Sequence, residues 1–391
     1  MRVVVAAWVG SSNLGDELVH AGLRRLLAQH GVQVAAITLD PAATRAAHGG
    51  IAISHRDPGR INRAVRSADA VLFGGGGLLQ DTTSPFNLPY HLARLLPARR
   101  HHIPVAAVGL GVGPLETRLG RALARRGLRG LVGCTVRDAA SRELLAELVD
   151  CDIEVAADLA FALPAPRSAD RATNRATGRA TDRATGRATG RATDRATGHA
   201  TGPPPREPGR LVVSLRPWGG GRSRLPAAAR GDDTPEEAVH ALAAALDAAV
   251  DASGHTCRFV ALQADRDDAF HRRVAAQMRT PATFATPHLD GLLDEFAAAS
   301  AVISMRYHGG VAATLAGRPA VLLGYDPKVA ALAGELGAGA RLLAFDAAAL
   351  PGIPAALAEV TGHADAVVAA RRTLQRRQAP TAELLSRMLQ R

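Results

Sequence analysis

Aromatic residues and cysteines are scarce in this chain of 391 residues, and their scarcity excludes several kinds of site. Tryptophan, tyrosine and phenylalanine make up 3% of the residues, too few beside 47 lysines and arginines to predict a stacking surface for single-stranded nucleic acid. The three cysteines, Cys134, Cys151 and Cys257, are far apart and match no spacing of metal ligands. We therefore expect no metal site and, because the thiols are sparse and unpaired, a reducing compartment.

Long apolar runs are lacking as well. No window holds about 18 uninterrupted apolar residues, so no membrane-spanning helix is predicted. The start, MRVVVAAWVG, has one arginine and a short apolar run, and it lacks the cleavage pattern of a signal peptide. These features favour a soluble, cytoplasmic protein.

The net charge of +11 resembles that of a nucleic-acid-binding protein, but much of it sits in one repeat. Residues 171–202 form eight four-residue units of the type Arg-Ala-Thr-Gly, and the first seven units contain seven arginines and two aspartates. Such a segment cannot bury enough surface to offset its ordering entropy. A proline-rich exit follows at 203–208. We interpret residues 164–208 as a disordered linker. A nucleic-acid-binding arm is the alternative, which we rank below it, and we expect no nucleic-acid partner.

The segments on both sides of the repeat alternate apolar strands with helices. Val3–Val9 and Val32–Leu39 predict strands around a helix at Leu18–Gln29, and Leu211–Leu215 restarts the same pattern after the repeat. The length and a hydrophobic content of 47% suit two packed domains. We therefore predict an α/β protein with two Rossmann-like doubly wound domains, at 1–163 and 209–363, and a C-terminal helix at 364–391.

Polar and glycine-rich stretches follow the predicted strands of the first domain. The loop Asn13–Asp16 should lie at the carboxyl edge of a parallel sheet, where α/β proteins bind ligands, although Asp16 could equally cap the helix. Gly74–Gly77, followed by Asp81, allows the backbone to approach a ligand closely. It matches neither a dinucleotide fingerprint nor a P-loop, and a flexible turn is the alternative.

The second domain gathers charge at its strand ends. Arg216 follows one predicted strand, and Arg306, Tyr307 and His308 follow another at Ala301–Ile303. Lys328 lies just beyond a third strand. A buried core segment has no reason to collect cations and a histidine at these positions, so the pattern favours a ligand site. For each arginine, a structural salt bridge is the alternative, and for His308 it is a contact with backbone at a helix start.

These residues together resemble the polysaccharide pyruvyl transferase family, and within it the cell-wall polysaccharide branch (CsaB type). The resemblance covers roughly 1–163 and 209–360. Its marks are Asn13-Leu14-Gly15-Asp16, Gly74-Gly75-Gly76-Gly77 with Asp81, Gly109-Leu110-Gly111-Val112-Gly113-Pro114, Val136-Arg137-Asp138 with Ser141, Asp158, Ser214-Leu215-Arg216, Ser304-Met305-Arg306-Tyr307-His308 and Tyr325-Asp326-Pro327-Lys328. Tyr307 stands where the family more often has leucine, and the repeat is no part of the family pattern.

The resemblance implies a glycosyltransferase fold B-like arrangement and a phosphoenolpyruvate-dependent transferase. The enolpyruvyl group would pass to a sugar of a cell-wall polysaccharide or lipid-linked glycan, of the ManNAc type, as a pyruvate ketal that supports S-layer anchoring. Phosphoenolpyruvate serves as a co-substrate, and no cofactor is expected. A fold B glycosyltransferase with a nucleotide-sugar donor and a non-catalytic glycan- or anion-binding protein are the rival interpretations.

The chemistry distributes the candidate residues over the two domains. The donor carries a phosphate and a carboxylate, which favours arginine forks with a lysine, and a histidine suits proton transfer near neutral pH. We predict a catalytic pair, a donor site in the second domain and an acceptor site in the first. The catalytic residues are His308 and Arg306; the donor site is Arg216, Arg306, Tyr307 and Lys328; the acceptor site is Asn13, Asp16, Gly75, Gly76 and Asp81. The basic surface adds the hypothesis of peripheral association with the inner face of an anionic membrane.

Overall fold

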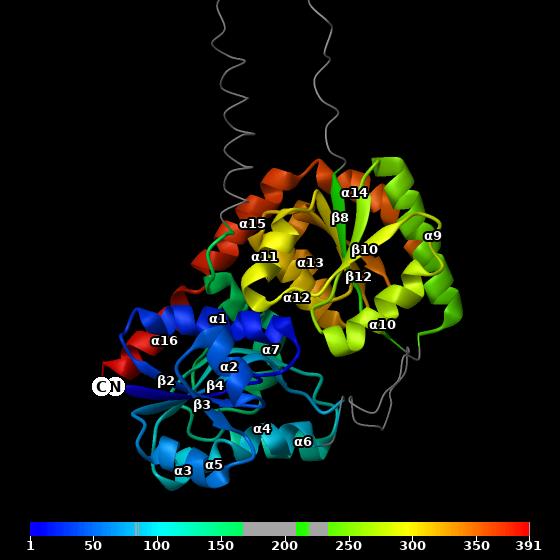
Figure 1. Ribbon diagram of the computed structural model, residues 1–391. Coiled ribbons are helices and arrows are strands. Elements are labelled where there is room, and N and C mark those ends of the chain that lie inside the picture. Colours follow the sequence, from blue (N-terminus) through cyan, green and yellow to red (C-terminus); the bar gives the residue numbers. More distant parts are fainter. Residues whose placement is uncertain (83, 85, 167–208, 219–233, 391) are drawn as a thin grey trace, which may run out of the picture.

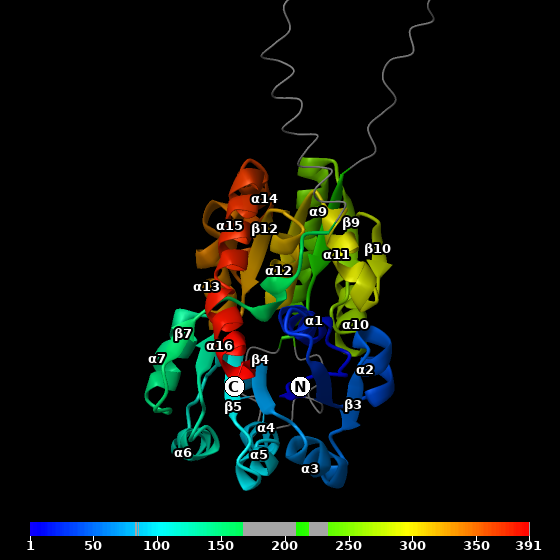
Figure 2. The same cartoon turned by 90° about the vertical axis from the view of Figure 1, so that its left-hand side faces the viewer.

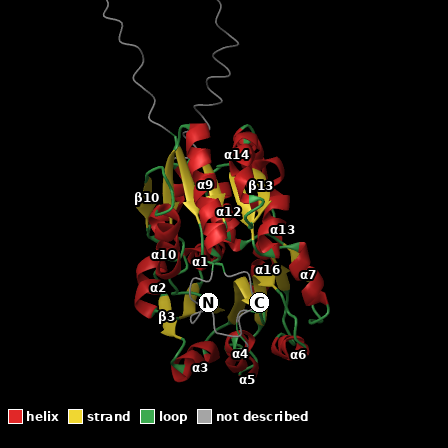
Figure 3. Cartoon of the chain, turned by 90° about the vertical axis from the view of Figure 1, so that its right-hand side faces the viewer, coloured by secondary structure: helices red, strands yellow, loops and turns green. Residues whose placement is uncertain are grey.

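Two parallel sheets organise the computed structural model, which describes residues 1–82, 84, 86–166, 209–218 and 234–390. Figure 1 shows them in two lobes, and Figure 3 shows the strands of each lobe flanked by helices. The expected pair of doubly wound sheets is confirmed. The predicted repeat and the proline-rich exit lie outside the described residues.

The N-terminal domain contains a seven-stranded parallel sheet in the order β3-β2-β1-β4-β5-β6-β7. Its strands are β1 Arg2–Ala6, β2 Gln33–Thr38, β3 Ile51–Ser54, β4 Ala70–Leu79, β5 Val105–Val112, β6 Cys134–Val136 and β7 Ile153–Val155. Its helices are α1 Leu14–Ala28, α2 Pro41–His48, α3 Pro58–Arg66, α4 Asn87–Ala93, α5 Leu96–Arg100, α6 Arg118–Gly127, α7 Ala139–Ala146 and the 3₁₀ turn η1 Leu159–Ala162. The strand order reverses between β1 and β4, where such sheets bind ligands.

The C-terminal domain repeats this topology in six strands, in the order β10-β9-β8-β11-β12-β13. The strands are β8 Arg210–Ser214, β9 Thr256–Val260, β10 Ala282–Ala285, β11 Ala301–Ser304, β12 Ala320–Gly324 and β13 Ala340–Ala344. The helices are α9 Glu236–Ser253, α10 Ala264–Ala275, α11 Leu289–Ala297, α12 Tyr307–Leu315, α13 Pro327–Leu336, α14 Ile353–Thr361, α15 Ala364–Arg376 and α16 Ala379–Leu389, with 3₁₀ turns η3 Gly337–Gly339 and η4 Leu350–Gly352. Here the reversal falls between β8 and β11.

The C-terminal segment was expected to be one helix at 364–391, and this prediction is wrong. The chain breaks between α15 and α16, with Pro380 in the first turn of α16. Proline has no amide hydrogen to donate and is favoured in a first turn, so it starts a new helix there. At the break, the Gln378 side chain donates to the carbonyl oxygens of Ala157 and Asp158 (3.2 and 2.7 Å). Helix α16 thereby returns to the N-terminal domain and packs near β6 (Figure 2).

The glycines at 74–77 were expected to form a loop after a strand, but β4 runs through them to Leu79. Gly75 has a φ of +82°, and a Cβ there would lie 2.6 Å from Cγ1 of Val19 on α1. At Gly74 a Cβ would lie 2.5 Å from the carbonyl oxygen of Val108 on β5. Side chains at these positions would therefore clash, and the glycines allow α1 and β5 to pack closely against β4.

The two domains share a packed interface. The Leu14 amide at the start of α1 donates to the Leu262 carbonyl after β9 (2.7 Å), and Asn13 bridges to Gln263. One hydrophobic core cluster joins Leu18 of α1 and Phe161 of η1 to residues of α11, α12 and α13. These contacts place the N-terminus of α1 against the N-terminus of α12.

Candidate active site

The carboxyl ends of the central strands of both sheets lead toward the domain interface (Figure 1). Strand β1 leads into the loop before Asn13, and β11 leads into Arg306 and α12. The predicted acceptor residues of the first domain and the predicted histidine of the second therefore come from facing loops. The sequence pattern predicted that both groups lie at strand ends, and the packing of the two domains brings these ends together.

Asp16 and Asn13 form one group at the start of α1. The Asn13 side-chain oxygen caps the helix by accepting from the Gly15 amide (3.2 Å), and its side-chain nitrogen donates to Asp16 Oδ2 (2.5 Å). A Cβ at Gly76 would lie 3.3 Å from Asp16 Oδ1, so the glycine leaves room for this carboxylate. Burial raises the pKa of Asp16 to about 6, and His308 and Asn13 offset only part of this effect.

His308 projects from the first turn of α12 toward the N-terminal domain. A Cβ at Gly15 would lie 2.3 Å from His308 Nδ1, so only glycine admits the imidazole there. His308 Nε2 lies 3.5 Å from Asp158 Oδ2, and neither atom has a hydrogen-bond partner in the part of the chain that the structure describes. Burial alone would raise the pKa of Asp158, but His308, Arg137 and the Ala160 amide together hold it below its usual value. Asp158 is therefore an ionised carboxylate beside the ring.

Tyr307 faces the N-terminal domain instead of the cations of its own domain. It is buried, and the Arg137 guanidinium lies 4.6 Å from the centre of its ring. Arg137 also pairs with Asp138 (3.0 Å) and approaches Asp158 (3.9 Å). These contacts form an interdomain cation–π pair. The structure thus separates Tyr307 from the rest of the predicted donor set.

Arg306 is engaged inside its own domain. It is 8% exposed, and its guanidinium pairs with the fully buried Asp267 on α10 and donates to Gln263 Oε1 (3.3 and 3.4 Å). Burial raises the pKa of Asp267, and Arg306 opposes that shift. The Asp267 carboxylate also accepts from the amides of Leu262 and Gln263. These contacts are those of a structural salt bridge, which was the alternative to a ligand-binding role for Arg306.

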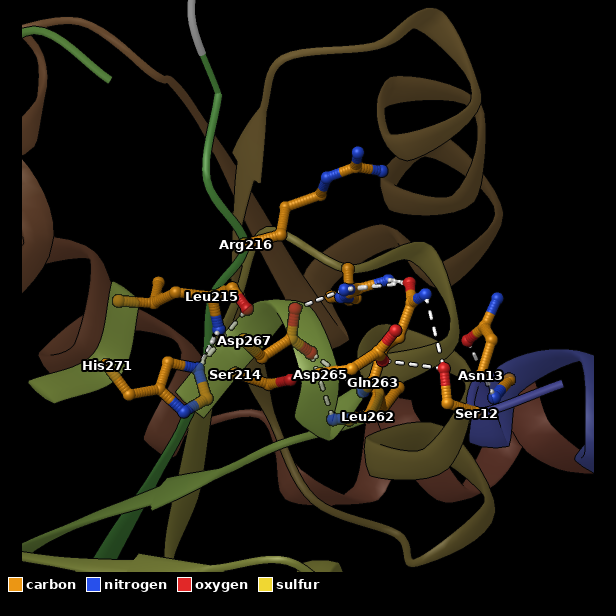
Figure 4. A network of polar contacts seen from close by, with 12 residues as sticks. Ser12, Asn13, Ser214, Leu215, Arg216, Leu262, Gln263, Asp265, Asp267 and His271 are labelled. Carbon is orange, nitrogen blue, oxygen red and sulfur yellow. Dashed lines mark hydrogen bonds and ion pairs between the residues drawn. The ribbon is translucent and has the colours of Figure 1, made fainter. Parts of the chain in front are cut away.

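A polar network links this pair to the other domain (Figure 4). The Ser12 hydroxyl donates to Asp265 (2.6 Å) and receives a longer bond from Gln263 Nε2 (3.4 Å). Gln263 therefore connects Arg306 in one domain with Ser12 in the other. The Arg216 side chain points away from this network, toward a different part of the strand edge.

Arg216 and Lys328 meet at Tyr325, just after β12. Arg216 Nη1 donates to the Tyr325 hydroxyl (3.3 Å), and Lys328 Nζ lies 5.8 Å from the centre of the same ring. The Trp218 ring packs against the Tyr325 ring, with 4.9 Å between the ring centres. Burial alone would raise the pKa of Tyr325, but Lys328, Arg216 and Arg306 together lower it. The phenol thus lies in a strongly positive environment.

Arg266, on the first turn of α10, adds another cation that the sequence patterns did not single out. Burial lowers its pKa, repulsion from Arg216 and Arg306 lowers it further, and Asp265 and Asp267 offset part of this shift. A group of mutually repelling cations is stabilised by a bound anion. Lys328 is balanced in part, because its ammonium group contacts Asp326 (3.0 Å).

Asp81 lies apart from the other predicted acceptor residues. Its carboxylate accepts from the amides of Glu116 and Thr117 (both 2.9 Å) and from the Thr117 hydroxyl (2.6 Å). Burial alone would raise the pKa of Asp81, but these hydrogen bonds lower it. Asp81 thus fixes the loop before α6, and Gly75 makes room for α1 as described above.

Within the described ranges, no group of three or more His, Cys, Asp or Glu side chains is arranged to hold a metal ion. No helix of that part of the chain has the length and apolar character needed to cross a bilayer.

Sequence reasoning gave no role to Arg137, Asp158, Asp267 or Arg266. The first two were noted only as residues of family motifs, at the end of β6 and before η1. The latter two lie on α10, where an Ala-Asp-Arg-Asp-Asp run reads as an ordinary charged helix start. Their proximity to Arg306 becomes visible only in the structure, where α10 packs against the loop after β11.

Comparison with known proteins places the chain in a sequence family and in a structural class. The profile described as "Polysaccharide pyruvyl transferase" matches residues 13–327. None of the curated protein sequences matches.

Three solved structures illustrate the similarity in fold. A glycosyltransferase from Rickettsia africae has a TM-score of 0.58 at 11% identity, with 98% of this chain and 97% of that chain covered. The UDP-GlcNAc 2-epimerase from Neisseria meningitidis, bound to UDP-GlcNAc, has a TM-score of 0.54 at 12% identity, with 100% and 99% covered. HepE from Anabaena, in complex with UDP and glucose, has a TM-score of 0.52 at 15% identity, with 98% and 99% covered. The expected glycosyltransferase fold B-like arrangement is thereby confirmed.

Proposed function

This chain belongs to the polysaccharide pyruvyl transferase family, and from that premise we propose that it transfers the enolpyruvyl group of phosphoenolpyruvate to a sugar of a cell-wall polysaccharide. Family membership implies transferase activity with phosphoenolpyruvate and a polysaccharide as substrates. The finer part of the proposal is a ManNAc-type acceptor on a lipid-linked glycan, a pyruvate ketal as product, and a role in S-layer anchoring.

The observation that carries the proposal is the positive cluster around Tyr325. Arg216 and Lys328 approach the Tyr325 ring, Arg306 lies near enough to lower the pKa of Tyr325, and Arg266 is a neighbour of Arg216 and Arg306. Phosphoenolpyruvate brings a phosphate and a carboxylate, and two anionic groups are best held by several cations at fixed positions. Arg216 and Lys328 are assigned to the donor. Arg306 supports them by its charge and by its pairing with Asp267.

His308 is assigned to proton transfer. A proton must reach the methylene carbon of the enolpyruvyl group, and one sugar hydroxyl must lose its proton as its oxygen bonds to the adjacent carbon. A second hydroxyl then displaces phosphate and closes the ketal. Imidazole suits these transfers near neutral pH. The neighbouring Asp158 carboxylate would orient the ring, and residues from both domains thereby build one catalytic group.

The acceptor is assigned to the N-terminal edge of the interface. Asn13 and Asp16 offer an amide and a carboxylate to sugar hydroxyls, next to the imidazole that would take the proton. Asp81 is left out of this assignment because the loop before α6 occupies its oxygens.

The test is turnover with phosphoenolpyruvate and synthetic lipid-linked ManNAc-containing acceptors. We expect phosphate release only when both substrates are present, together with a product heavier by one pyruvate ketal. A matched incubation with a UDP-sugar in place of phosphoenolpyruvate is the control for a nucleotide-sugar transferase. UDP release in that control, without phosphate release in the main reaction, would overturn the proposal. Binding of both substrates without any turnover would favour a non-catalytic role.

A further inference from the structure

Helices α3, α5 and α6 lie at the end of the N-terminal domain that points away from the C-terminal domain (Figures 1 and 2). This end takes no part in the candidate active site. It is nevertheless unusual in charge and in apolar exposure.

The segment 86–132 contains eight arginines and a single acidic residue, Glu116. It therefore holds a large share of the net charge of +11, in a folded part of the chain. One of the eight, Arg94, is buried and donates to the Ala7 carbonyl. Most of the others are exposed. Most of this charge is thus displayed on the surface, and Arg121 is balanced by Glu147 just after α7 (2.8 Å).

Helix α6 shows this surface most clearly. Arg118, Leu119, Arg125 and Arg126 are exposed, while Ala124 packs into the core. Leu119, Arg125 and Arg126 follow Arg118 by one, seven and eight residues, which places the four side chains along one side of the helix. Within the described residues, neither the Arg118 nor the Arg126 side chain makes a hydrogen bond or an ion pair.

Large apolar side chains are exposed among these cations. Leu96 on α5 is 58% exposed, Leu119 on α6 is 70% exposed, and Val132 is 47% exposed. Exposed leucines beside arginines also occur on helices that lie in the boundary between the headgroups and acyl chains of a bilayer.

A groove of about 500 Å³ runs between α5 and the segment after α6. Leu95, Ile103 and Leu131 contribute to its lining, together with Arg99 and Arg129. Arg99 crosses it to donate to the carbonyls of Gly127 and Arg129 (2.7 and 3.1 Å). An apolar floor beside guanidinium groups suits a phospholipid, with its phosphate near the cations.

We propose that the α5–α6 surface, composed of Leu96, Arg100, Arg118, Leu119, Arg125 and Arg126, docks the protein onto an anionic lipid bilayer. The arginines attract the phosphates of the headgroups, and the leucines enter the boundary between headgroups and acyl chains. A nucleic acid would use the arginines but would gain nothing from the leucines. The proposal goes beyond the proposed function and does not depend on it.

The experiment is sedimentation of the full chain with vesicles. One set is phosphatidylcholine, and the other contains phosphatidylcholine and phosphatidylglycerol in equal parts. We expect binding to the second set only, weakened by salt. The double variant Arg118→Glu/Arg126→Glu should bind roughly 25-fold more weakly, at about fivefold for each arginine lost. Leu119→Ser should weaken binding without changing its salt dependence.

The matched control is Arg372→Glu/Arg376→Glu, which changes the same charge at exposed positions on α15. It should bind as the unchanged protein does. Equal loss in both double variants would show that net charge alone drives binding, and full binding by the α6 variant would place the contact elsewhere. Stronger binding to a single-stranded polynucleotide than to the vesicles would also overturn the proposal. Turnover of a short, lipid-free acceptor should be unchanged in the α6 variant, so this result separates the docking surface from the active site.

Discussion

Replacing Asp16 by asparagine tests whether ionisation of the Asp16 carboxyl destabilises the folded chain. The pKa of Asp16 rises from 3.8 to about 6, chiefly through burial. That shift corresponds to about 3 kcal/mol of unfavourable ionisation in the folded state. Because the pKa is higher in the folded than in the unfolded chain, the stabilisation by the neutral form is complete below about pH 4 and is lost as the pH rises through about 6.

Asp16→Asn removes this ionisation and keeps an oxygen that can accept from Asn13. The variant should therefore be more stable than the unchanged protein at about pH 8, by up to about 3 kcal/mol, and nearly equal to it at about pH 4. Urea denaturation followed by circular dichroism at both pH values measures the difference. A variant that is no more stable at the higher pH, or equally stabilised at both, would refute the reasoning about burial.

Asp81→Asn is the matched control, because hydrogen bonds lower the pKa of Asp81 although burial opposes them. When the pKa of a carboxyl is lower in the folded than in the unfolded chain, the carboxylate stabilises the fold at pH values above the unfolded-state pKa. This stabilisation is lost as the pH falls through the folded-state pKa. This variant should therefore lose stability at neutral pH.

In turnover assays, Asp16→Asn should raise the KM for the acceptor more than the KM for phosphoenolpyruvate.

Three further replacements address the second domain. His308→Ala should abolish turnover with unchanged circular dichroism, and substantial activity in the folded variant would rule out His308 as the acid–base group. Arg306→Ala should cost about 3–5 kcal/mol in urea denaturation, because Asp267 stays buried without its partner; unchanged stability would contradict the pairing. Arg216→Gln should raise the KM for phosphoenolpyruvate at least tenfold (about 1.4 kcal/mol, the scale of one charged hydrogen bond), whereas an effect on the acceptor KM alone would contradict the division of substrates between domains.

The fold could be predicted from the sequence because both halves repeat apolar strands, polar strand exits and amphipathic helices. The positions of Asp16 and His308 at facing strand ends follow from the same rule. The prediction that the glycines of β4 approach a ligand was not met at Gly75, which instead makes room for Val19 of α1. The sequence alone does not distinguish a glycine required by helix packing from one required by a ligand. The break before α16 lies in a helical pattern that only Pro380 interrupts.

Partners that lie far apart in the chain could not be predicted. Arg306 is 39 residues from Asp267, and nothing in either segment indicates that α10 packs beside the loop after β11. Tyr307 was grouped with the donor cations because it stands between Arg306 and His308. The first turn of α12 instead directs its ring toward Arg137 in the other domain. Helix geometry separates neighbours in sequence, and tertiary packing supplies their partners.

The central claim is that the cations around Tyr325 bind phosphoenolpyruvate, and direct titration tests it. Trp218 packs against Tyr325, so its fluorescence should report binding in a Trp8→Phe variant, where it is the sole tryptophan of the chain. We predict a saturable change with phosphoenolpyruvate in the absence of acceptor, lost in Arg216→Gln/Lys328→Gln, and no such change with UDP. Saturation by UDP with no response to phosphoenolpyruvate would contradict the account.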